Sequence, residues 1–339
     1  MLIIEHVEEK NNMKKCIFIV PYFGKLPDFF PIFLKSCKYN PTFNWLIITN
    51  DETDYDYPLN VSPMYMSFSE FKEKTQSKFD FPISLDTYQK LCDYKPSYGY
   101  LLEDKIENYK FWGFCDIDVI LGDLEHFITD DMLDQYDKIF ELGHCTLIRN
   151  TPEINRTFME KINGISEYKK SFMNNKVTIF DEVYGNTPNV NDIFLNKRKK
   201  VFGKNYAFDI QTDKLYFQNS GFDYKTQTFK HEQEYRNKLC VWDKGILRRF
   251  YQKNGVLKSQ EYMYVHLQDR KVGWTQKALE ADRLLIIPNY IMPLPQEITY
   301  NNFKKIPKLH LDVNTLRFAL SLERAKLRNK FKFSRVNNL

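Results

Sequence analysis

Phe111–Leu121 reads FWGFCDIDVIL, an apolar run that contains two acids, Asp116 and Asp118. Such a run is typical of a strand that is buried on both faces of a parallel sheet. Two acids in it are costly to bury unless something compensates their charge. A divalent cation does so, because Mg²⁺ and Mn²⁺ take oxygen ligands from one or two carboxylates and from phosphates. The stretch therefore predicts a metal site at Asp116 and Asp118 that can also hold a diphosphate.

The spacing of the two acids allows two arrangements. If the strand stays regular, Asp116 and Asp118 lie on one face of it. If the strand ends at the motif, the two acids divide metal binding from ribose or phosphate binding. A purely structural pair of acids is the alternative to both.

The residues before the motif predict the rest of the sheet. Cys16–Val20 and Trp45–Thr49 are continuous apolar, β-favouring runs, and Val61–Met66 is a third candidate strand. Helical spacing occupies residues 27–38, 69–79 and 96–109. This alternation predicts an α/β fold with a Rossmann-like, doubly wound, mostly parallel sheet that carries helices on both faces.

The chain changes character after the motif. Asp137–Arg149 is a further candidate strand, and Thr151-Pro152 opens a helix with a capping hydroxyl and a proline at its first position. Residues 165–260 are polar, aromatic and irregular apart from a helix near 191–200, and residues 257–267 regain strand character. Because no repeat or low-complexity linker interrupts the chain, we expect one domain. Its nucleotide-sugar-binding half spans residues 1–125, its acceptor-binding, catalytic half spans 126–310, and a tail spans 311–339.

Composition excludes several classes of protein. Of the 339 residues, 43% are hydrophobic and 27% are charged, which is ordinary for a soluble protein with a sizeable core. The apolar runs are too short or too interrupted to cross a bilayer, and the N-terminus lacks the basic region and cleavage site of a secretory signal. Six scattered cysteines lack the spacing of a metal site. We therefore expect a cytoplasmic protein, and nucleic acid is not among its expected partners.

Two other classes of protein share features with this chain. Haloacid-dehalogenase-like phosphatases carry D-x-D-x-[TV] after their first strand and use the first acid as nucleophile. Here Ile120 occupies the fifth position, and the motif comes long after the first predicted strand. A non-catalytic glycan-binding protein would suit an aromatic content of 16%, because sugar C–H groups pack on aromatic rings. It would not explain two buried acids.

Five segments carry a resemblance to a known family: Val20–Gly24, Lys90–Gly99, Trp112–Asp118, Leu142–Asn150 and Tyr264–Gln268. Together they resemble a family of bacterial glycosyltransferases that are encoded in capsule and surface-polysaccharide loci. That family is similar to the glycosyltransferase-A superfamily. The resemblance implies a glycosyltransferase-A-like fold, Mn²⁺ or Mg²⁺ as cofactor, and a UDP-sugar as donor. The implied acceptor is an oligosaccharide or lipid-linked glycan of a surface polysaccharide, at the inner face of the plasma membrane.

The resemblance also implies nucleotide-binding residues after the first two strands. Pro21, Tyr22 and Phe23 follow the first predicted strand, where α/β sheets bind nucleotides. Tyr22 or Phe23 is expected to stack on uracil, and Asp51 to accept a hydrogen bond from the ribose or base. Core packing is the alternative for the two aromatic residues.

Three further residues are implied close to the donor. Asp93 and Lys95 resemble the nucleotide-contacting segment that precedes the motif, and a surface loop is the alternative for both. Asp116 is expected to contact nucleotide as well as metal. His266 resembles the late histidine that completes the metal shell in this superfamily, and neutral imidazole is a good ligand for Mn²⁺. The predicted metal ligands are therefore Asp116, Asp118 and His266, with a core histidine as the alternative for His266.

An inverting transfer needs a base for the acceptor hydroxyl. Asp181 and Glu182 follow an apolar step in the half that is expected to face the acceptor. Asp181 is the first candidate and Glu182 the second, and a solvated acidic turn is the alternative. His144 either lines the acceptor pocket or packs in the core.

The C-terminal tail is strongly basic. Between Arg317 and Arg335 it has one acid, Glu323, and seven bases: Arg317, Arg324, Lys326, Arg328, Lys330, Lys332 and Arg335. Four apolar residues fall near one helical face: Leu316, Leu320, Leu327 and Phe331. Such a helix can lie on an anionic membrane, or it can pack its apolar stripe on the domain.

Overall fold

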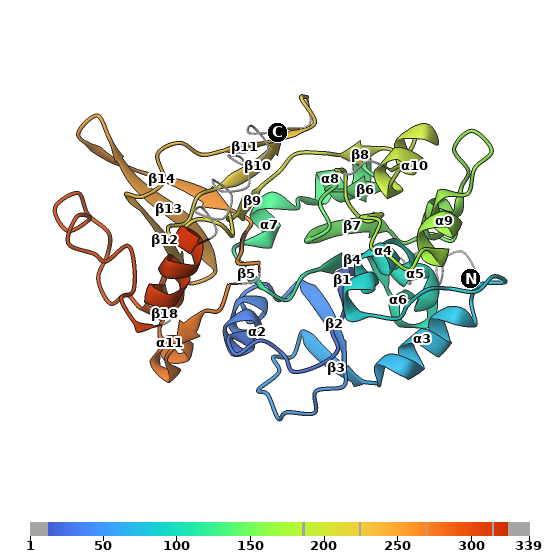
Figure 1. Cartoon of the computed structure of the whole chain (residues 1–339), viewed down its shortest axis with the longest axis horizontal. Helices are drawn as coiled ribbons and strands as arrows, with labels where there is room; N and C mark the ends of the chain where they lie inside the picture. The colour runs from blue at the N-terminus through green and yellow to red at the C-terminus, as the bar shows by residue number, and fades with distance from the viewer. Residues whose placement is uncertain (1–12, 185–186, 224, 269, 314, 325–339) are drawn as a thin grey trace, which may run out of the picture. The chain divides into compact units, whose positions relative to one another are not determined.

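The computed structural model describes residues 13–184, 187–223, 225–268, 270–313 and 315–324 (Figure 1). Contacts divide the chain into two compact units. Unit 1 comprises Met1–Ile117, Leu124–Asn205 and Tyr224–Thr228, and unit 2 comprises Asp118–Asp123, Tyr206–Asp223 and Phe229–Leu339. A boundary between the units therefore falls inside the D-x-D motif. The division predicted at residue 125 separates donor binding from acceptor binding, whereas the two units are defined by contacts between residues. The predicted division therefore stays a prediction.

Unit 1 contains a seven-stranded sheet of order β3-β2-β1-β4-β7-β6-β8 (Figure 1). Its strands are β1 Lys14–Pro21, β2 Phe43–Thr49, β3 Val61–Tyr65, β4 Tyr109–Cys115, β6 Lys138–Ile139, β7 Cys145–Arg149 and β8 Val201–Phe202. The pairs β1–β2, β1–β4 and β2–β3 are parallel, which confirms the predicted parallel half. Strand β7 is antiparallel to β4 and β6, whereas β6 and β8 are parallel.

Both faces of this sheet are buried. Ile17 and Ile19 of β1 point into one hydrophobic cluster, together with Leu46 of β2. Phe18, between them, stacks on Trp45 on the other face, with ring centroids 5.5 Å apart. Because β1 is apolar on both faces, it takes a central position in the sheet. The predicted α/β class with a mostly parallel sheet is confirmed for this half of unit 1.

The helices of unit 1 are short. They are α2 Phe30–Lys38, α3 Phe68–Gln76, η1 Tyr88–Lys90, α4 Leu91–Tyr94, η2 Lys95–Ser97, α5 Tyr98–Leu101, α6 Glu103–Ile106, α7 Leu124–Phe127, α8 Asp130–Gln135, η3 Ile154–Met159, α9 Glu167–Met173 and α10 Val190–Asn196. The prediction of one continuous helix over residues 96–109 was wrong. The break between α5 and α6 lies at Leu102, whose φ of −126° and ψ of 37° are not helical, and Gly99 in α5 is a poor helix former.

Unit 2 is built mainly from antiparallel strands. Its six-stranded sheet has the order β14-β13-β12-β17-β18-β16, and its three-stranded sheet has the order β5-β15-β9. The strands are β5 Val119–Leu121, β9 Ala207–Asp209, β12 Lys238–Asp243, β13 Ile246–Lys253, β14 Val256–Tyr262, β15 Tyr264–His266, β16 Gly273–Trp274, β17 Arg283–Ile287 and β18 Tyr290–Pro293. Helix α11 spans Gln276–Glu280, and residues 315–324 are also helical. A further two-stranded ribbon pairs β10 Ser220–Asp223 with β11 Thr228–His231.

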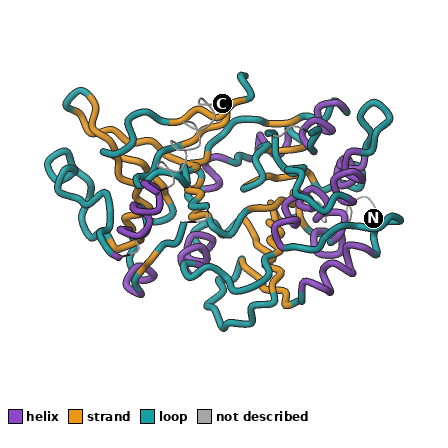
Figure 2. Tube along the Cα trace, viewed as in Figure 1, coloured by secondary structure: helices purple, strands orange, loops and turns teal. Residues whose placement is uncertain are grey.

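Two predictions fail in unit 2. The region predicted to be irregular contains the hairpins β12–β13 and β13–β14, which Figure 2 shows as strands. Both hairpin turns carry two successive residues with positive φ, Lys244-Gly245 and Asn254-Gly255. Such turns match the twist of paired strands. The single strand predicted over residues 257–267 is two strands, β14 and β15, that belong to different sheets and are separated by Met263.

No helix among the described residues is both long enough and apolar enough to span a membrane.

Candidate active site

The motif strand ends at its first acid. Strand β4 stops at Cys115, and β5 starts at Val119 in a different sheet. The prediction of one strand to Leu121 was therefore wrong, and the alternative in which the strand ends at the motif is confirmed. The two aspartates belong to different units, with Asp116 in unit 1 and Asp118 in unit 2.

Asp116 lies at the switch point of the unit 1 sheet. Strand β1 has β2 on one side and β4 on the other, so the strand order reverses between β1 and β4. Ligands of open α/β sheets bind at the carboxyl ends of strands at such a point. Phe18 of β1 pairs with Gly113 of β4, and extending this register by three residues sets Pro21 opposite Asp116. The predicted nucleotide-binding segment after β1 and the first acid of the motif thus share one edge of the sheet.

A lysine links two acids beside this edge. The Lys95 Nζ donates to Asp116 Oδ1 at 2.7 Å and to the Gly143 carbonyl oxygen at 2.9 Å. It also lies 3.4 Å from Asp181 Oδ2. Burial alone would lower the pKa of Lys95, but the charges of Asp116 and Asp181 outweigh burial and raise that pKa well above its usual value. Lys95 is therefore a fixed cation between two of the predicted site residues.

Asp181 is an enclosed acid rather than part of a solvated turn. Its side chain is 1% exposed, so the alternative of a solvated acidic turn is wrong for it. Burial raises the pKa of Asp181 to about 8 despite Lys95, with Glu182 and Asp116 contributing in the same direction. A Cβ atom on Gly143 would meet Asp181 Oδ2 at 2.3 Å and Glu182 Cγ at 2.6 Å. The side chains of Asp181 and Glu182 can thus pack against the backbone at residue 143 because that residue is glycine.

Asp93 holds the segment that carries Asp181. It is fully buried, so the surface-loop alternative is wrong for this residue. Its oxygens accept from Lys90 Nζ at 2.6 Å and from the backbone N–H groups of Thr178 and Phe180, both at 2.9 Å. The observed role of Asp93 is structural, and its predicted contact with nucleotide stays a prediction.

The predicted stacking residues after β1 differ in their surroundings. Phe23 is 4% exposed and packs edge-on against Phe68, with ring centroids 5.3 Å apart. Core packing therefore explains Phe23. Tyr22 is only half-buried, and its backbone N–H donates to the Ile48 carbonyl oxygen at 2.8 Å. Of the two residues, only Phe23 is fully buried.

Asp51 shapes the loop that follows β2. Its carboxylate accepts from the Leu26 N–H at 2.8 Å and from the Thr53 hydroxyl at 2.6 Å. The Thr53 hydrogen bond, together with those from backbone N–H groups, outweighs burial and lowers the pKa of Asp51. The residue is thus an anion at neutral pH, as its predicted contact with ribose or base would require, and the contact itself stays a prediction.

Unit 2 contributes the second acid and the predicted histidine. Strand β15 lies between β5 and β9, and His266 has Val119 and Asp209 as its register partners. His266 Nε2 lies 3.3 Å from Asp118 Oδ1, and His266 Nδ1 lies 2.9 Å from Asp209 Oδ1. The prediction thus brought Asp118 and His266 together correctly, although their role as ligands stays a prediction.

The donor set in unit 2 fits a divalent metal ion. Two ligand atoms in adjacent octahedral positions, with bonds of about 2.1 Å, are about 3 Å apart. The 3.3 Å between Asp118 Oδ1 and His266 Nε2 is close to that separation. Burial would lower the pKa of His266, but the charge of Asp118 and hydrogen bonds to Asp118 and Asp209 raise it well above 6.5. A proton therefore competes with a metal ion for Nε2.

The sequence analysis missed Asp209. This acid ends β9, a short apolar strand that reads Ala207-Phe208-Asp209. An acid at the end of a buried strand is the same signal that identified Asp116. It was overlooked because the strand is only three residues long and lies in the region predicted to be irregular.

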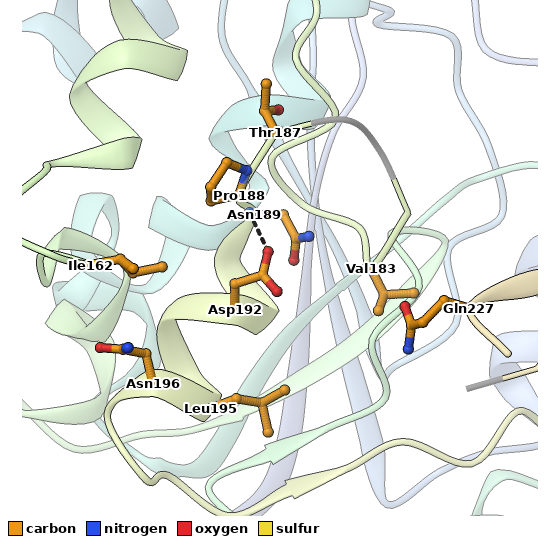
Figure 3. A pocket seen from close by; sticks show the side chains of 9 residues that line it. All are labelled: Ile162, Val183, Thr187, Pro188, Asn189, Asp192, Leu195, Asn196 and Gln227. Atoms are coloured by element: carbon orange, nitrogen blue, oxygen red, sulfur yellow. Dashed lines mark hydrogen bonds between the residues drawn. The ribbon is translucent and has the colours of Figure 1, made fainter. Parts of the chain in front are cut away.

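A cavity of about 600 Å³ lies in unit 1, and Val183 is one of the residues that line it (Figure 3). Its lining combines the apolar Ile162, Val183, Pro188 and Leu195 with the polar Thr187, Asn189, Asp192, Asn196 and Gln227. Asp192 accepts from the Asn189 N–H at 2.9 Å, which begins helix α10 with a capping box. Val183 follows Asp181 by two residues, so the predicted base and the cavity share one segment.

Comparisons with known proteins place the chain in a family. No curated protein matches it. Among solved structures, the galactosyltransferase LgtC, crystallised with donor and acceptor sugar analogs, matches at 13% identity and a TM-score of 0.31. That match covers 58% of this chain and 75% of LgtC. Residues 18–295 match the family of unknown function DUF6625, and the chain therefore belongs to that family.

Proposed function

We propose that the chain is a metal-dependent glycosyltransferase of the hexosyltransferase type. It would move a sugar from a UDP-sugar to a surface-polysaccharide acceptor, either an oligosaccharide or a lipid-linked glycan. The observation that carries the proposal is the 3.3 Å approach of His266 Nε2 to the second acid of the D-x-D motif. A carboxylate and an imidazole in this arrangement are suited to Mn²⁺. When bound, the metal would neutralise the leaving diphosphate.

Residues of unit 1 support the donor side of this proposal. Asp116 and the segment after β1 lie at the switch point of the sheet, where nucleotides bind in α/β folds. Tyr22 would stack on the base, and Asp51 would accept from the ribose. Lys95 would hold Asp116 in place and keep a positive charge near the phosphates.

The acceptor side would use Asp181, with Glu182 as the second candidate. A general base works best when its pKa is near the working pH, and burial raises the pKa of Asp181 to about 8. The 600 Å³ cavity offers amide, hydroxyl and carboxylate groups beside apolar side chains, a mixture that suits a sugar. The acceptor would reach Asp181 along the segment that contains Val183. The protein would work in the cytoplasm, at the inner face of the membrane.

The proposal is tested with the full-length protein and a panel of UDP-sugars. We expect UDP release that EDTA abolishes and that Mn²⁺ restores better than Ca²⁺, because imidazole prefers the transition metal. Full activity in EDTA would overturn the metal-dependent mechanism. Turnover of p-nitrophenyl phosphate without any nucleotide sugar would instead favour a phosphatase in which Asp116 is the nucleophile.

A further inference from the structure

His266 is bonded through both ring nitrogens, and only one of these contacts belongs to the D-x-D motif. Nε2 faces Asp118, whereas Nδ1 lies 2.9 Å from Asp209 Oδ1. We propose that Asp209 is the positioning residue of the metal site, which accepts the Nδ1 proton and so presents the unprotonated Nε2 to the metal. The inference rests on the proposed metal-dependent function and adds a residue to its site.

The strand pairing explains why Asp209 can fill this role. β15 runs parallel to β9, and His266 and Asp209 are direct register partners. On the other side of β15, His266 pairs with Val119, the residue that follows Asp118. The Leu267 N–H donates to the Asp118 carbonyl oxygen at 2.8 Å, which ties the motif to β15. The backbone thus sets an acid on each side of the imidazole.

The carboxylate of Asp209 is itself held in place. Its side chain is 9% exposed, and its Oδ1 accepts a second hydrogen bond from Gln268 Nε2 at 2.8 Å. A buried carboxylate with two donors on one oxygen has little freedom to rotate. The ring of His266 is therefore fixed in orientation, and the carboxylate of Asp209 favours a proton on Nδ1.

A carboxylate behind a metal-binding imidazole has a known physical effect. It fixes the tautomer and raises the basicity of the ligand nitrogen, and its removal typically weakens metal binding 10- to 100-fold. Asp209→Ala removes the acceptor of the Nδ1 proton. Asp209→Asn keeps an acceptor oxygen but removes the charge. It should therefore retain the His266 tautomer with the proton on Nδ1 and lose less metal affinity than Asp209→Ala.

The first experiment measures Mn²⁺ binding by electron paramagnetic resonance on metal-free, full-length protein. We expect Asp209→Ala to bind Mn²⁺ about 10- to 100-fold more weakly than wild type, and Asp209→Asn to lie between them. At saturating Mn²⁺, the ¹⁴N coupling of a bound imidazole should be strong in wild type and reduced in Asp209→Ala. Asp213→Asn, a change at a 63% exposed acid of the same unit, is the matched control and should bind as wild type does.

The second readout needs no metal. In ¹⁵N-histidine spectra of the metal-free protein, the Nδ1-bound proton of His266 should be slow to exchange in wild type and Asp209→Asn, and fast in Asp209→Ala. If Asp209→Ala does not fold, Asp209→Asn carries both measurements. Equal Mn²⁺ affinity and unchanged ¹⁴N coupling in the Asp209 variants would overturn the positioning role alone. A wild-type protein that binds no Mn²⁺ would overturn the proposed metal-dependent function, and the positioning role with it.

Discussion

The two aspartates of the D-x-D motif, although separated by one residue, have different partners. Asp116 accepts from Lys95 in unit 1, whereas Asp118 faces His266 in unit 2. The charge of Asp116 is thus already compensated by a lysine of its own unit. Asp118 has an imidazole as its partner instead, and a deprotonated imidazole is suited to bind a metal ion. Asp118 is therefore the acid on which metal binding should depend more strongly.

We predict that Asp118→Ala lowers sugar transfer by ~10²-fold or more, as for other removed electrostatic stabilisers. The fold should stay intact because Asp118 is a quarter exposed, although loss of its ion pair with His266 should lower the melting temperature at neutral pH. Transfer and melting are measured on the purified variant, with Asp213→Ala as the exposed control. Near wild-type transfer by Asp118→Ala would contradict the ligand assignment.

Asp181 predicts a dependence of stability on pH. Its pKa is 3.8 in a model peptide and about 8 in the folded protein, chiefly because it is buried. Between these values the folded state binds a proton that the unfolded state has lost, so rising pH destabilises the fold. Asn cannot ionise. We therefore expect the melting temperature of Asp181→Asn, relative to wild type, to rise steadily from pH 5 to pH 8.5.

The measurement is a set of thermal melts across that range, with Asp213→Asn as the exposed control. A constant difference between Asp181→Asn and wild type would show that Asp181 is ionised throughout, with its charge compensated by Lys95.

At the scale of elements, continuous apolar runs were predicted well and broken ones were not. β1 and β2 are buried strands whose residues alone indicate their type, and β3 was also predicted although only Val61 of it is buried. β4 ends at Cys115, and the next residue, Asp116, contacts Lys95 from a distant segment, which no local sequence pattern contains. Similarly, β14 and β15 are continuous in sequence, and only their different partner strands separate them.

The hairpins of unit 2 carried a local signal that the sequence analysis did not use. Lys244-Gly245 and Asn254-Gly255 are two-residue turns between strand-forming segments, and Asn-Gly is a strong hairpin signal. The polar character of β13 and β14 concealed them, because these strands expose many of their side chains.

The approach of α5 to β4 makes Gly99 a sensitive position. A Cβ atom there would meet the indole of Trp112 at 2.1 Å. Trp112 is fully buried and its Nε1 donates to Asn155 at 2.7 Å, so the ring cannot move away without losing that bond. We predict that Gly99→Ala destabilises the fold by about 1–3 kcal/mol, as overpacked cores do.

Denaturant unfolding checks this prediction. Gly221→Ala is the control, because a Cβ atom at Gly221 has nothing within 4 Å. If Gly99→Ala unfolds at the same denaturant concentration as wild type, α5 does not pack on Trp112 as described.

For the whole molecule, each unit holds its own group of candidate residues, drawn from segments that the sequence analysis assigned to separate halves. The unit boundary passes between Ile117 and Asp118, so each acid of the motif joins side chains from its own unit. Lys95 and Asp181 join Asp116, and Asp209 and His266 join Asp118. The sequence identified most of these residues by type and by resemblance. Their grouping could not be predicted, because it depends on sheet pairings between strands far apart in the chain.

The start of the C-terminal tail is described by the structure, and it supports a sharper test of membrane binding. Thr315 is buried and accepts from Asn289 at 3.1 Å, and the Arg270 guanidinium lies 4.8 Å from the Phe318 ring. These contacts fix one side of the helix over residues 315–324. Leu316 and Leu320, in the same helix, are each 59% exposed. Five of the seven basic residues lie beyond Arg324, outside the described residues, as do Leu327 and Phe331.

We predict that the full-length protein sediments with anionic vesicles and that a chain cut after Arg324 does so far less. Each Lys or Arg near an anionic leaflet contributes ~1 kcal/mol, and salt should weaken binding because the Debye length is only ~10 Å at 0.1 M. Cutting after Arg324 spares the Phe318 contact, which a cut before Arg317 would remove.

The double variant Leu316→Ser and Leu320→Ser should weaken vesicle binding in a salt-independent way, since it removes apolar burial rather than charge. Val256→Ser, at a valine that is 55% exposed in β14, is the matched control. Equal sedimentation of the cut and full-length chains would show that the tail does not bind the membrane. Activity on a soluble acceptor should survive the cut, because every proposed site residue precedes Gln268.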